Sequence, residues 1–211
     1  MKTALGAVYS MFPAPVMLLG ANVNGKPNYC TICCVGPMEH MRYICVGSQP
    51  NQYTTEGIRQ NSTFSVNIPS IADVGKTDCC GIVSGHDKDK SILFESFYGK
   101  LKTAPMITQF PVCMECKVAR IIDDVFDDHD LIIGELIETY CEENCLTEGK
   151  VDMSKVKPLH YAHEIWNGRS YWTIGDSLAK AWDAGKDLAD KDLADKDLAD
   201  KDLAEKAADR S

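Results

Sequence analysis

The sequence predicts a mainly β protein built as a barrel of short strands, and three observations support this fold class. Short apolar segments rich in β-branched residues recur at close spacing along residues 1–185. Few segments of that region have the pattern of a helix. Forty-five percent of the 211 residues are hydrophobic, which is enough for a core that needs no disulfide scaffold.

The expected strands follow from alternation and residue type. Residues 41–48 (MRYICVGS), 112–122 (VCMECKVARII) and 130–140 (DLIIGELIETY) are rich in residues that favour strands. Residues 64–68 (FSVNI) alternate apolar and polar side chains, as a half-buried strand does. The acidic residues 123–130 (DDVFDDHD) suit a hairpin turn, and their spacing is not that of a calcium loop.

One short helix is expected before the strand at Phe64. Residues 52–61 (QYTTEGIRQN) have the helical pattern, with Asn51 as the candidate N-cap. At the other end of the chain, the pentad KDLAD repeats from Lys186 to Glu205, the last copy ending in Glu. Its leucines advance by about 140° per repeat around a helix, so they form no buried stripe. We expect a domain over residues 1–185 and an exposed or disordered tail over residues 186–211.

The charge and the N-terminus exclude several classes of function. The net charge is −9 and no basic stripe stands out, which argues against nucleic acid as a partner. Tyr9, Pro13 and Pro15 interrupt the N-terminal apolar stretch, unlike the core of a signal peptide. The apolar run 14–21 is far shorter than the ~20 residues that span a bilayer. We therefore expect a cytoplasmic protein that is not inserted in a membrane.

Ten cysteines, including two C-x-x-C spacings, raise the alternative of a zinc or iron–sulfur site. Residues i and i+3 of a strand point to opposite faces, so Cys30 and Cys33 would not chelate one ion, nor would Cys113 and Cys116. Their neighbours are apolar rather than the glycines of a metal knuckle. We interpret these thiols, and those of the pairs 79/80 and 141/145, as reduced and buried in the core.

Other catalytic motifs are missing from the sequence. The pair His160 and His163 is not the zinc-protease pattern, and GIVSG at residues 81–85 is not G-x-S-x-G. Neither G-x-G-x-x-G nor a Walker A sequence occurs. These observations exclude a Rossmann or P-loop nucleotide site and give no catalytic acid, base or nucleophile.

Three polar segments remain as candidate ligand contacts. They are residues 28–31, the hydroxyl-rich loop 47–57 that runs into the expected helix, and residues 81–91 with Gly85, Lys88 and Lys90. Backbone N–H groups at a helix N-terminus and a nearby lysine bind phosphate well. Together the three segments provide the parts for a phosphorylated, planar ligand.

The order and spacing of these segments resemble the flavin reductase-like domain family, and the flavoredoxin-like subgroup in particular. The resemblance covers about residues 3–185, from FPAPVMLLGANVNGKPNYCTICCVG to LHYAHEIWNGRSYWTIGDSLAKAW. It implies an FMN-binding split β-barrel, a homodimer, and electron transfer through non-covalent FMN. The KDLAD tail lies outside the family pattern.

The resemblance also implies the residues of the FMN site. Asn28, Cys30, Thr31 and Ile32 would contact the flavin ring. A second set would surround the ribityl chain and the phosphate: Ser48, Gln49, Tyr53, Thr54, Ser84, Gly85 and Lys90. Many family members carry arginine at the positions of Gln49 and His86, so the phosphate contacts here rest on Lys90 and backbone amides.

Two activities follow from the resemblance, and a third class stands beside them. The first is an NAD(P)H-dependent flavin reductase, in which nicotinamide stacks on FMN and passes a hydride to it. The second is a flavoredoxin-like electron carrier whose donor is a protein. The third is a cysteine-rich metal-binding module. The sequence names neither the donor nor the acceptor of electrons.

Overall fold

The computed structural model describes residues 2–8, 10, 13–39, 42–123, 127–164 and 168–186. The chain separates into two compact units, residues 1–174 and 175–211. All the elements discussed below belong to the first unit. The KDLAD repeat lies outside the described residues except for Lys186, so the expected boundary at residue 185 stays a prediction. In the part of the chain that is described, no helix is long and apolar enough to cross a membrane.

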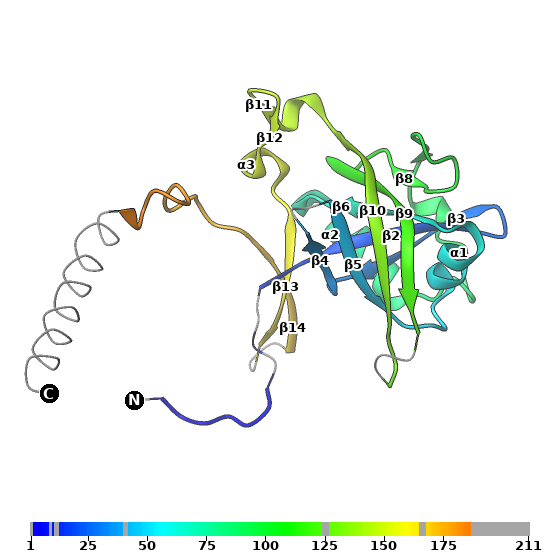
Figure 1. Ribbon diagram of the computed structural model, residues 1–211, viewed down its shortest axis with the longest axis horizontal. Helices are drawn as coiled ribbons and strands as arrows, with labels where there is room; N and C mark the ends of the chain where they lie inside the picture. The colour runs from blue at the N-terminus through cyan, green and yellow to red at the C-terminus, as the bar shows by residue number, and fades with distance from the viewer. Residues whose placement is uncertain are drawn as a thin grey trace, which may run out of the picture. The chain divides into compact units, whose positions relative to one another are not determined.

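A seven-stranded antiparallel sheet forms the centre of the molecule, and it curls like half of a barrel (Figure 1). Its order is β3-β2-β6-β9-β10-β5-β4. The strands are β2 (Met17–Val23), β3 (Lys26–Ile32), β4 (Val35–Met38), β5 (Tyr43–Ser48), β6 (Thr63–Ile68), β9 (Val112–Ile122) and β10 (Asp130–Cys141). The mainly β barrel predicted from the sequence is confirmed, and β5, β6, β9 and β10 match the four expected strands.

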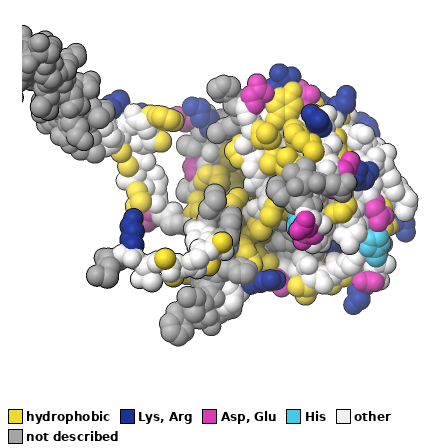
Figure 2. Space-filling model, turned by 60° about the horizontal axis from the view of Figure 1, so that its bottom comes forward, with side chains coloured by type: hydrophobic (Ala, Val, Ile, Leu, Met, Phe, Trp, Pro, Cys, Tyr) yellow, Lys and Arg dark blue, Asp and Glu magenta, His cyan; other side chains and the backbone are white. Residues whose placement is uncertain are grey.

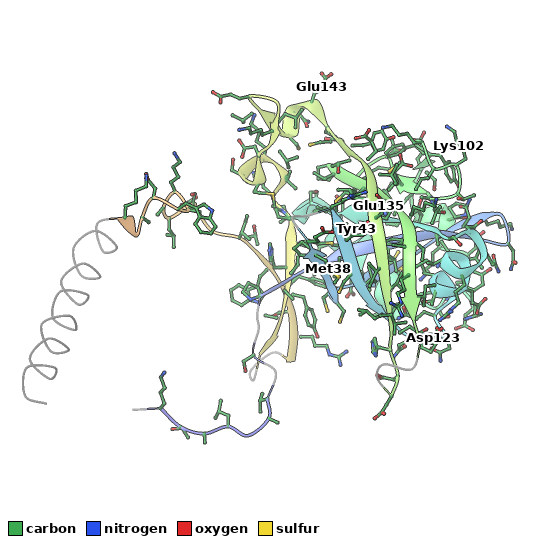
Figure 3. The ribbon with its side chains drawn as sticks, in the orientation of Figure 1. Met38, Tyr43, Lys102, Asp123, Glu135 and Glu143 are labelled. Atoms are coloured by element: carbon green, nitrogen blue, oxygen red, sulfur yellow. The ribbon has the colours of Figure 1, made fainter. Side chains whose placement is uncertain are left out.

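Cross-strand pairs show the register of this sheet at its surface. Tyr43 of β5 lies opposite Glu135 of β10, and Arg42 bonds the Glu135 carboxylate at 2.7 Å (Figure 3). The segment between β9 and β10 connects two antiparallel neighbours, as the expected hairpin requires. Residues 124–126 of this segment are not among the residues that the structure describes. On the face in Figure 2, the coloured basic and acidic side chains are interspersed and form no basic stripe.

Smaller sheets surround the barrel. β1 (Ala14–Pro15), β13 (Leu159–Glu164) and β14 (Gly168–Thr173) form a three-stranded antiparallel sheet. β7 (Ser96–Phe97) pairs with β8 (Met106–Ile107), and β11 (Leu146–Thr147) pairs with β12 (Lys150–Val151). The β13–β14 hairpin lies beside the seven-stranded sheet in Figure 1 and contributes one wall of a cavity described below.

The helices are short. They are α1 (Tyr53–Asn61), α2 (Val74–Ile82) and α3 (Met153–Val156), with 3-10 turns η1 (Ile71–Asp73), η2 (Ser91–Leu93) and η3 (Glu143–Cys145). Helix α1 confirms the expected helix, but the N-cap assignment to Asn51 is wrong. Gln52 is the N-cap, because its carbonyl accepts the first helical bond from Glu56 N–H at 3.2 Å.

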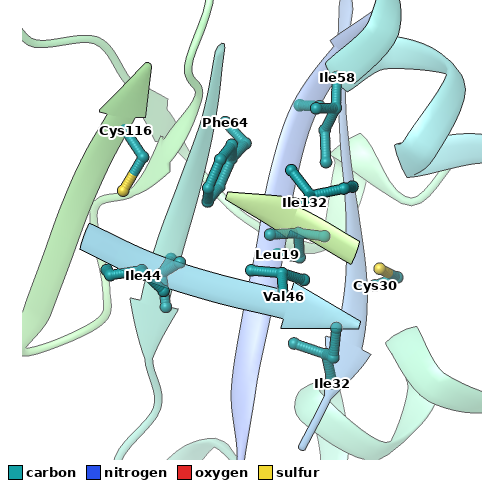
Figure 4. Close-up of a cluster of buried hydrophobic side chains, with 11 residues drawn as sticks. Leu19, Cys30, Ile32, Ile44, Val46, Ile58, Phe64, Cys116 and Ile132 are labelled. Carbon is teal, nitrogen blue, oxygen red and sulfur yellow. The ribbon is translucent and has the colours of Figure 1, made fainter. Parts of the chain in front are cut away.

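The main hydrophobic core lies inside the curl of the sheet (Figure 4). Leu19, Val46, Phe64 and Ile132 are fully buried there, and Ile58 brings helix α1 into the same cluster. Truncating a buried phenylalanine to alanine typically costs ~3–5 kcal/mol. Because Ile58 is buried in this cluster, it fixes α1 against the sheet. It thereby holds the N-terminus of that helix beside strand β3.

The ten cysteines divide into three groups, and three of them, Cys45, Cys79 and Cys141, are only half-buried. Five are buried, as expected of core thiols: Cys30, Cys80, Cys113, Cys116 and Cys145. Cys33 and Cys34 are exposed, so the core interpretation is wrong for them. The physical reason is that β3 ends at Ile32, and the strand alternation that would bury a side chain stops there. Among the residues that are described, no three His, Cys, Asp or Glu side chains gather as metal ligands would.

Candidate functional site

A cavity of about 310 Å³ opens between strand β3, the start of helix α1 and the end of helix α2. This volume is within the range of about 300–1,000 Å³ typical of small-molecule sites. The cavity is lined by Asn28, Cys30, Thr31, Gln49, Asn51, Gln52, Tyr53, Thr54, Cys80, Gly81, Ile82, Val83, Ser84, Gly85 and Lys90. The three polar segments singled out in the sequence therefore meet at one place.

The N-terminus of helix α1 lies at this cavity, where Gln52, Tyr53 and Thr54 are lining residues. Gln52 makes no side-chain cap bond, so the first-turn N–H groups lack a capping partner from it. The positive end of the helix dipole adds to their attraction for an anion. Asn28 on β3 donates to the Thr54 hydroxyl at 2.7 Å, and both side chains are buried. This bond ties the strand to the first turn of the helix.

The loop before α1 is fixed by hydroxyl groups behind the cavity. Ser48 is fully buried and bonds Thr55 at 2.8 Å and the Gln52 amide oxygen at 2.9 Å. Thr55 in turn donates to the carbonyl of Gln49 at 2.9 Å. Ser48 does not line the cavity itself. It positions the loop and the helix start that do.

Gly85 allows the loop after α2 to pack directly against the other two segments. A Cβ atom at this position would lie 2.4 Å from Tyr53 Cδ1 and 2.6 Å from Asn28 Oδ1. Real Cβ atoms do not approach other atoms so closely, so any larger residue displaces Tyr53 or Asn28. Glycine therefore lets the backbone at residue 85 form the floor of the site.

Lys90 places a buried positive charge at the cavity wall. It is 4% exposed, and its Nζ donates to the carbonyls of Cys80 at 3.2 Å and Val83 at 2.9 Å. These are carbonyls at the C-terminal end of α2, where a cation is favoured by the helix dipole. An ammonium group carries three N–H donors, so one remains for a ligand in the cavity.

The two cysteines of this cavity are neutral thiols. Burial raises the pKa of Cys30, and it raises the pKa of Cys80 to about 12, while the nearby charge of Lys90 opposes both shifts. At neutral pH both side chains keep their protons. They act as small apolar groups beside the polar donors, and they supply no anionic ligand for a metal.

The structure brings together nine of the eleven residues expected at the site. Ile32 lies instead at a second cavity, and Ser48 lies behind the first. Gly81, Ile82 and Val83 lie within the polar segment 81–91, but they were not named as site residues, and Cys80 was missed because helix α2 was not expected.

The second cavity, also of about 310 Å³, adjoins the first and shares Thr31, Gly81 and Ile82 with it. Its other lining residues come from the β1–β2 junction, the end of β3 and the link after it, α2, and the β13–β14 hairpin: Val16, Ile32, Cys33, Asp78, Tyr161, Arg169, Ser170 and Tyr171. Tyr171 donates to Asp78 at 2.9 Å. The shared residues place the two cavities side by side.

The fold and the site define a class of protein. The profile of the flavin reductase like domain matches residues 9–165, which is most of the chain. The chain therefore belongs to this family, as its resemblance implied.

Two solved structures are similar to this chain in both sequence and fold. The chain is 42% identical to flavoredoxin from Methanosarcina acetivorans, over 89% of this chain and 99% of that one, with a TM-score of 0.83. It is 32% identical to flavoredoxin of Desulfovibrio vulgaris (Miyazaki F), over 88% and 100% of the two chains, with a TM-score of 0.79. This likeness agrees with the flavoredoxin-like subgroup.

A relative from Escherichia coli (strain K12), the uncharacterized protein YddH, is 24% identical over 123 residues. The match covers 56% of this chain and 65% of YddH, so the chain spans less than two thirds of that relative's length. It adds no activity to the family assignment.

Proposed function

We propose that this chain binds FMN in the cavity between β3, α1 and α2 and transfers electrons through it. The observation that supports the proposal best is the pairing of the uncapped α1 N-terminus with the buried Lys90 at one cavity. The two features suit the phosphate of FMN at the polar end of the site. Family membership and the flavoredoxin likeness support a flavin as the ligand.

The lining residues fit this cofactor. Ser84, Gly85 and Lys90 would hold the phosphate together with the first-turn amides of α1. Tyr53 and Thr54 would border the ribityl chain, and Asn28, Cys30 and Thr31 would border the flavin ring along β3. Bound FMN supplies the redox chemistry, while the chain binds it, orients it and limits water at the ring. The electron transfer needs no side-chain acid or base.

For the electron donor, we propose NAD(P)H, which makes the protein a flavin reductase. The second cavity supports this proposal, because it adjoins the first at Thr31, Gly81 and Ile82 and has room for a nicotinamide ring. The second candidate is an electron carrier with a protein donor. The likeness to the two flavoredoxins favours that candidate. We further propose a homodimer in the cytoplasm, without nucleic acid or membrane as partner.

One anaerobic experiment separates these candidates. The FMN-loaded protein is mixed in a stopped-flow instrument with NADH, NADPH or reduced ferredoxin, and flavin absorbance is followed. Fast bleaching by one nucleotide supports the reductase, and bleaching by ferredoxin alone supports the carrier. Purified protein that holds a stoichiometric metal and does not bind FMN would contradict both.

A further inference from the structure

Cys33 and Cys34 form a pair of neighbouring thiols that the proposed FMN site does not use. Both are exposed, in contrast to the five core cysteines. They occupy the two-residue link between the end of β3 at Ile32 and the start of β4 at Val35. The carbonyl of Cys34 accepts a bond from Gly47 N–H at 2.9 Å, so the link is held against strand β5.

The two side chains interact with each other. A hydrogen bond from the Cys33 thiol is the largest cause that lowers the pKa of Cys34 to about 6, and His129 lowers it further while burial opposes both. The same hydrogen bond raises the pKa of Cys33. At neutral pH the pair is therefore one thiolate and one thiol, the state from which disulfides form and exchange.

The pair also lies beside the proposed flavin site. Cys33 lines the second cavity together with Thr31 and Ile82, which line the FMN cavity as well. Tyr171, on β14, lines the same cavity. Cys33 therefore lies at the cavity that adjoins the proposed FMN site.

We propose that Cys33 and Cys34 are a redox-active dithiol that closes to a disulfide and exchanges an electron pair with the flavin. The inference rests on the proposed function, because it takes FMN as the electron partner. At neutral pH, reduction breaks the Sγ–Sγ bond, takes up two electrons and one proton, and restores the Cys33 thiol and the Cys34 thiolate. The electrons come from reduced flavin, which is oxidised in the same step.

Chain geometry favours a disulfide that is easily reduced. Neighbouring Cα atoms are about 3.8 Å apart, below the range of about 4.4–6.8 Å usual for disulfides. Such a bond is strained, and strained, exposed disulfides are the labile and catalytic ones. The pair Cys79 and Cys80 offers a natural comparison. It lies on helix α2, where successive side chains point about 100° apart, and Cys80 is buried.

The test begins with protein freed of FMN, so that disulfide formation is measured without the flavin. The protein is oxidised with diamide, alkylated, digested and analysed by mass spectrometry. We expect a bond between Cys33 and Cys34, and its loss in Cys33→Ser, which keeps a hydroxyl beside Cys34. Cys79→Ser is the matched control and should leave the bond unchanged. Absence of the 33–34 bond in oxidised wild-type protein would overturn the proposal.

The second stage measures electron uptake after FMN is added back. Diamide-oxidised protein is titrated anaerobically with dithionite, and flavin absorbance and free thiols are followed. We expect about four electrons per chain, from two two-electron couples, and about two in Cys33→Ser. If wild-type protein takes up only about two electrons and the 33–34 disulfide is still present after the titration, exchange with the flavin is refuted. Failure to bind FMN, measured separately by absorbance, would instead refute the proposed function.

Discussion

The substitution Gly85→Ala tests the geometry of the FMN site most sharply. The new Cβ would lie 2.4 Å from Tyr53 and 2.6 Å from Asn28, so at least one of the two side chains must move. A shift of Asn28 also breaks its 2.7 Å bond to Thr54 at the start of α1. Overpacking of this kind costs ~1–3 kcal/mol. At 1.4 kcal/mol per tenfold change, FMN affinity should fall by about 5- to 150-fold.

The assay is a titration of flavin-free protein with FMN, followed by the quenching of flavin fluorescence. Gly75→Ala is the matched control, because a Cβ at Gly75, on the exposed side of α2, meets nothing within 4 Å. It should leave FMN affinity unchanged and alter stability by no more than ~1 kcal/mol, in the stabilising direction. FMN binding by Gly85→Ala within twofold of the wild-type value would refute the proposed packing of the site.

Three further predictions concern the phosphate, the thiols and the tail. Lys90→Ala should weaken FMN binding by ~1.5–3 kcal/mol and riboflavin binding hardly at all; equal losses in calorimetry would show that Lys90 acts only on the fold. Alkylation of Cys34 by iodoacetamide should rise as pH passes about 6 and then level off, because the thiolate reacts. In Cys33→Ala the midpoint should move toward about 8.5, and an unmoved midpoint would contradict the hydrogen bond. Truncation after Lys186 should leave an FMN-loaded dimer with an unchanged reductase rate, and a monomer in sedimentation would contradict that expectation.

Sequence patterns were reliable where a local rule determined the structure. The alternation of residues 64–68 predicted β6, and the β-branched residues of 112–122 predicted β9 with the same bounds. Helix α2 was not expected, because Gly75 and Gly81 lie within its nine residues and its apolar pattern is weak. Local propensity there is overridden by packing of Thr77 and Cys80 against the barrel.

Long-range contacts of the site were outside the reach of local rules. No spacing in the sequence shows that Lys90 bonds the carbonyls at the end of α2. The error at Cys33 has a similar origin, because strand alternation was carried past Ile32, where β3 ends. The resemblance to the family brought most of the lining residues together, since it relates segments by their place in a common fold rather than by local pattern.

The most direct test of the account is the flavin stoichiometry of the flavin-free protein after addition of FMN. The protein is incubated with excess FMN, freed of unbound ligand by gel filtration, and analysed by absorbance and by metal analysis. The account predicts about one FMN per chain, with riboflavin retained much more weakly because it lacks the phosphate that the α1 N-terminus and Lys90 would bind. Protein that emerges without flavin, or that retains riboflavin as well as FMN, would contradict it.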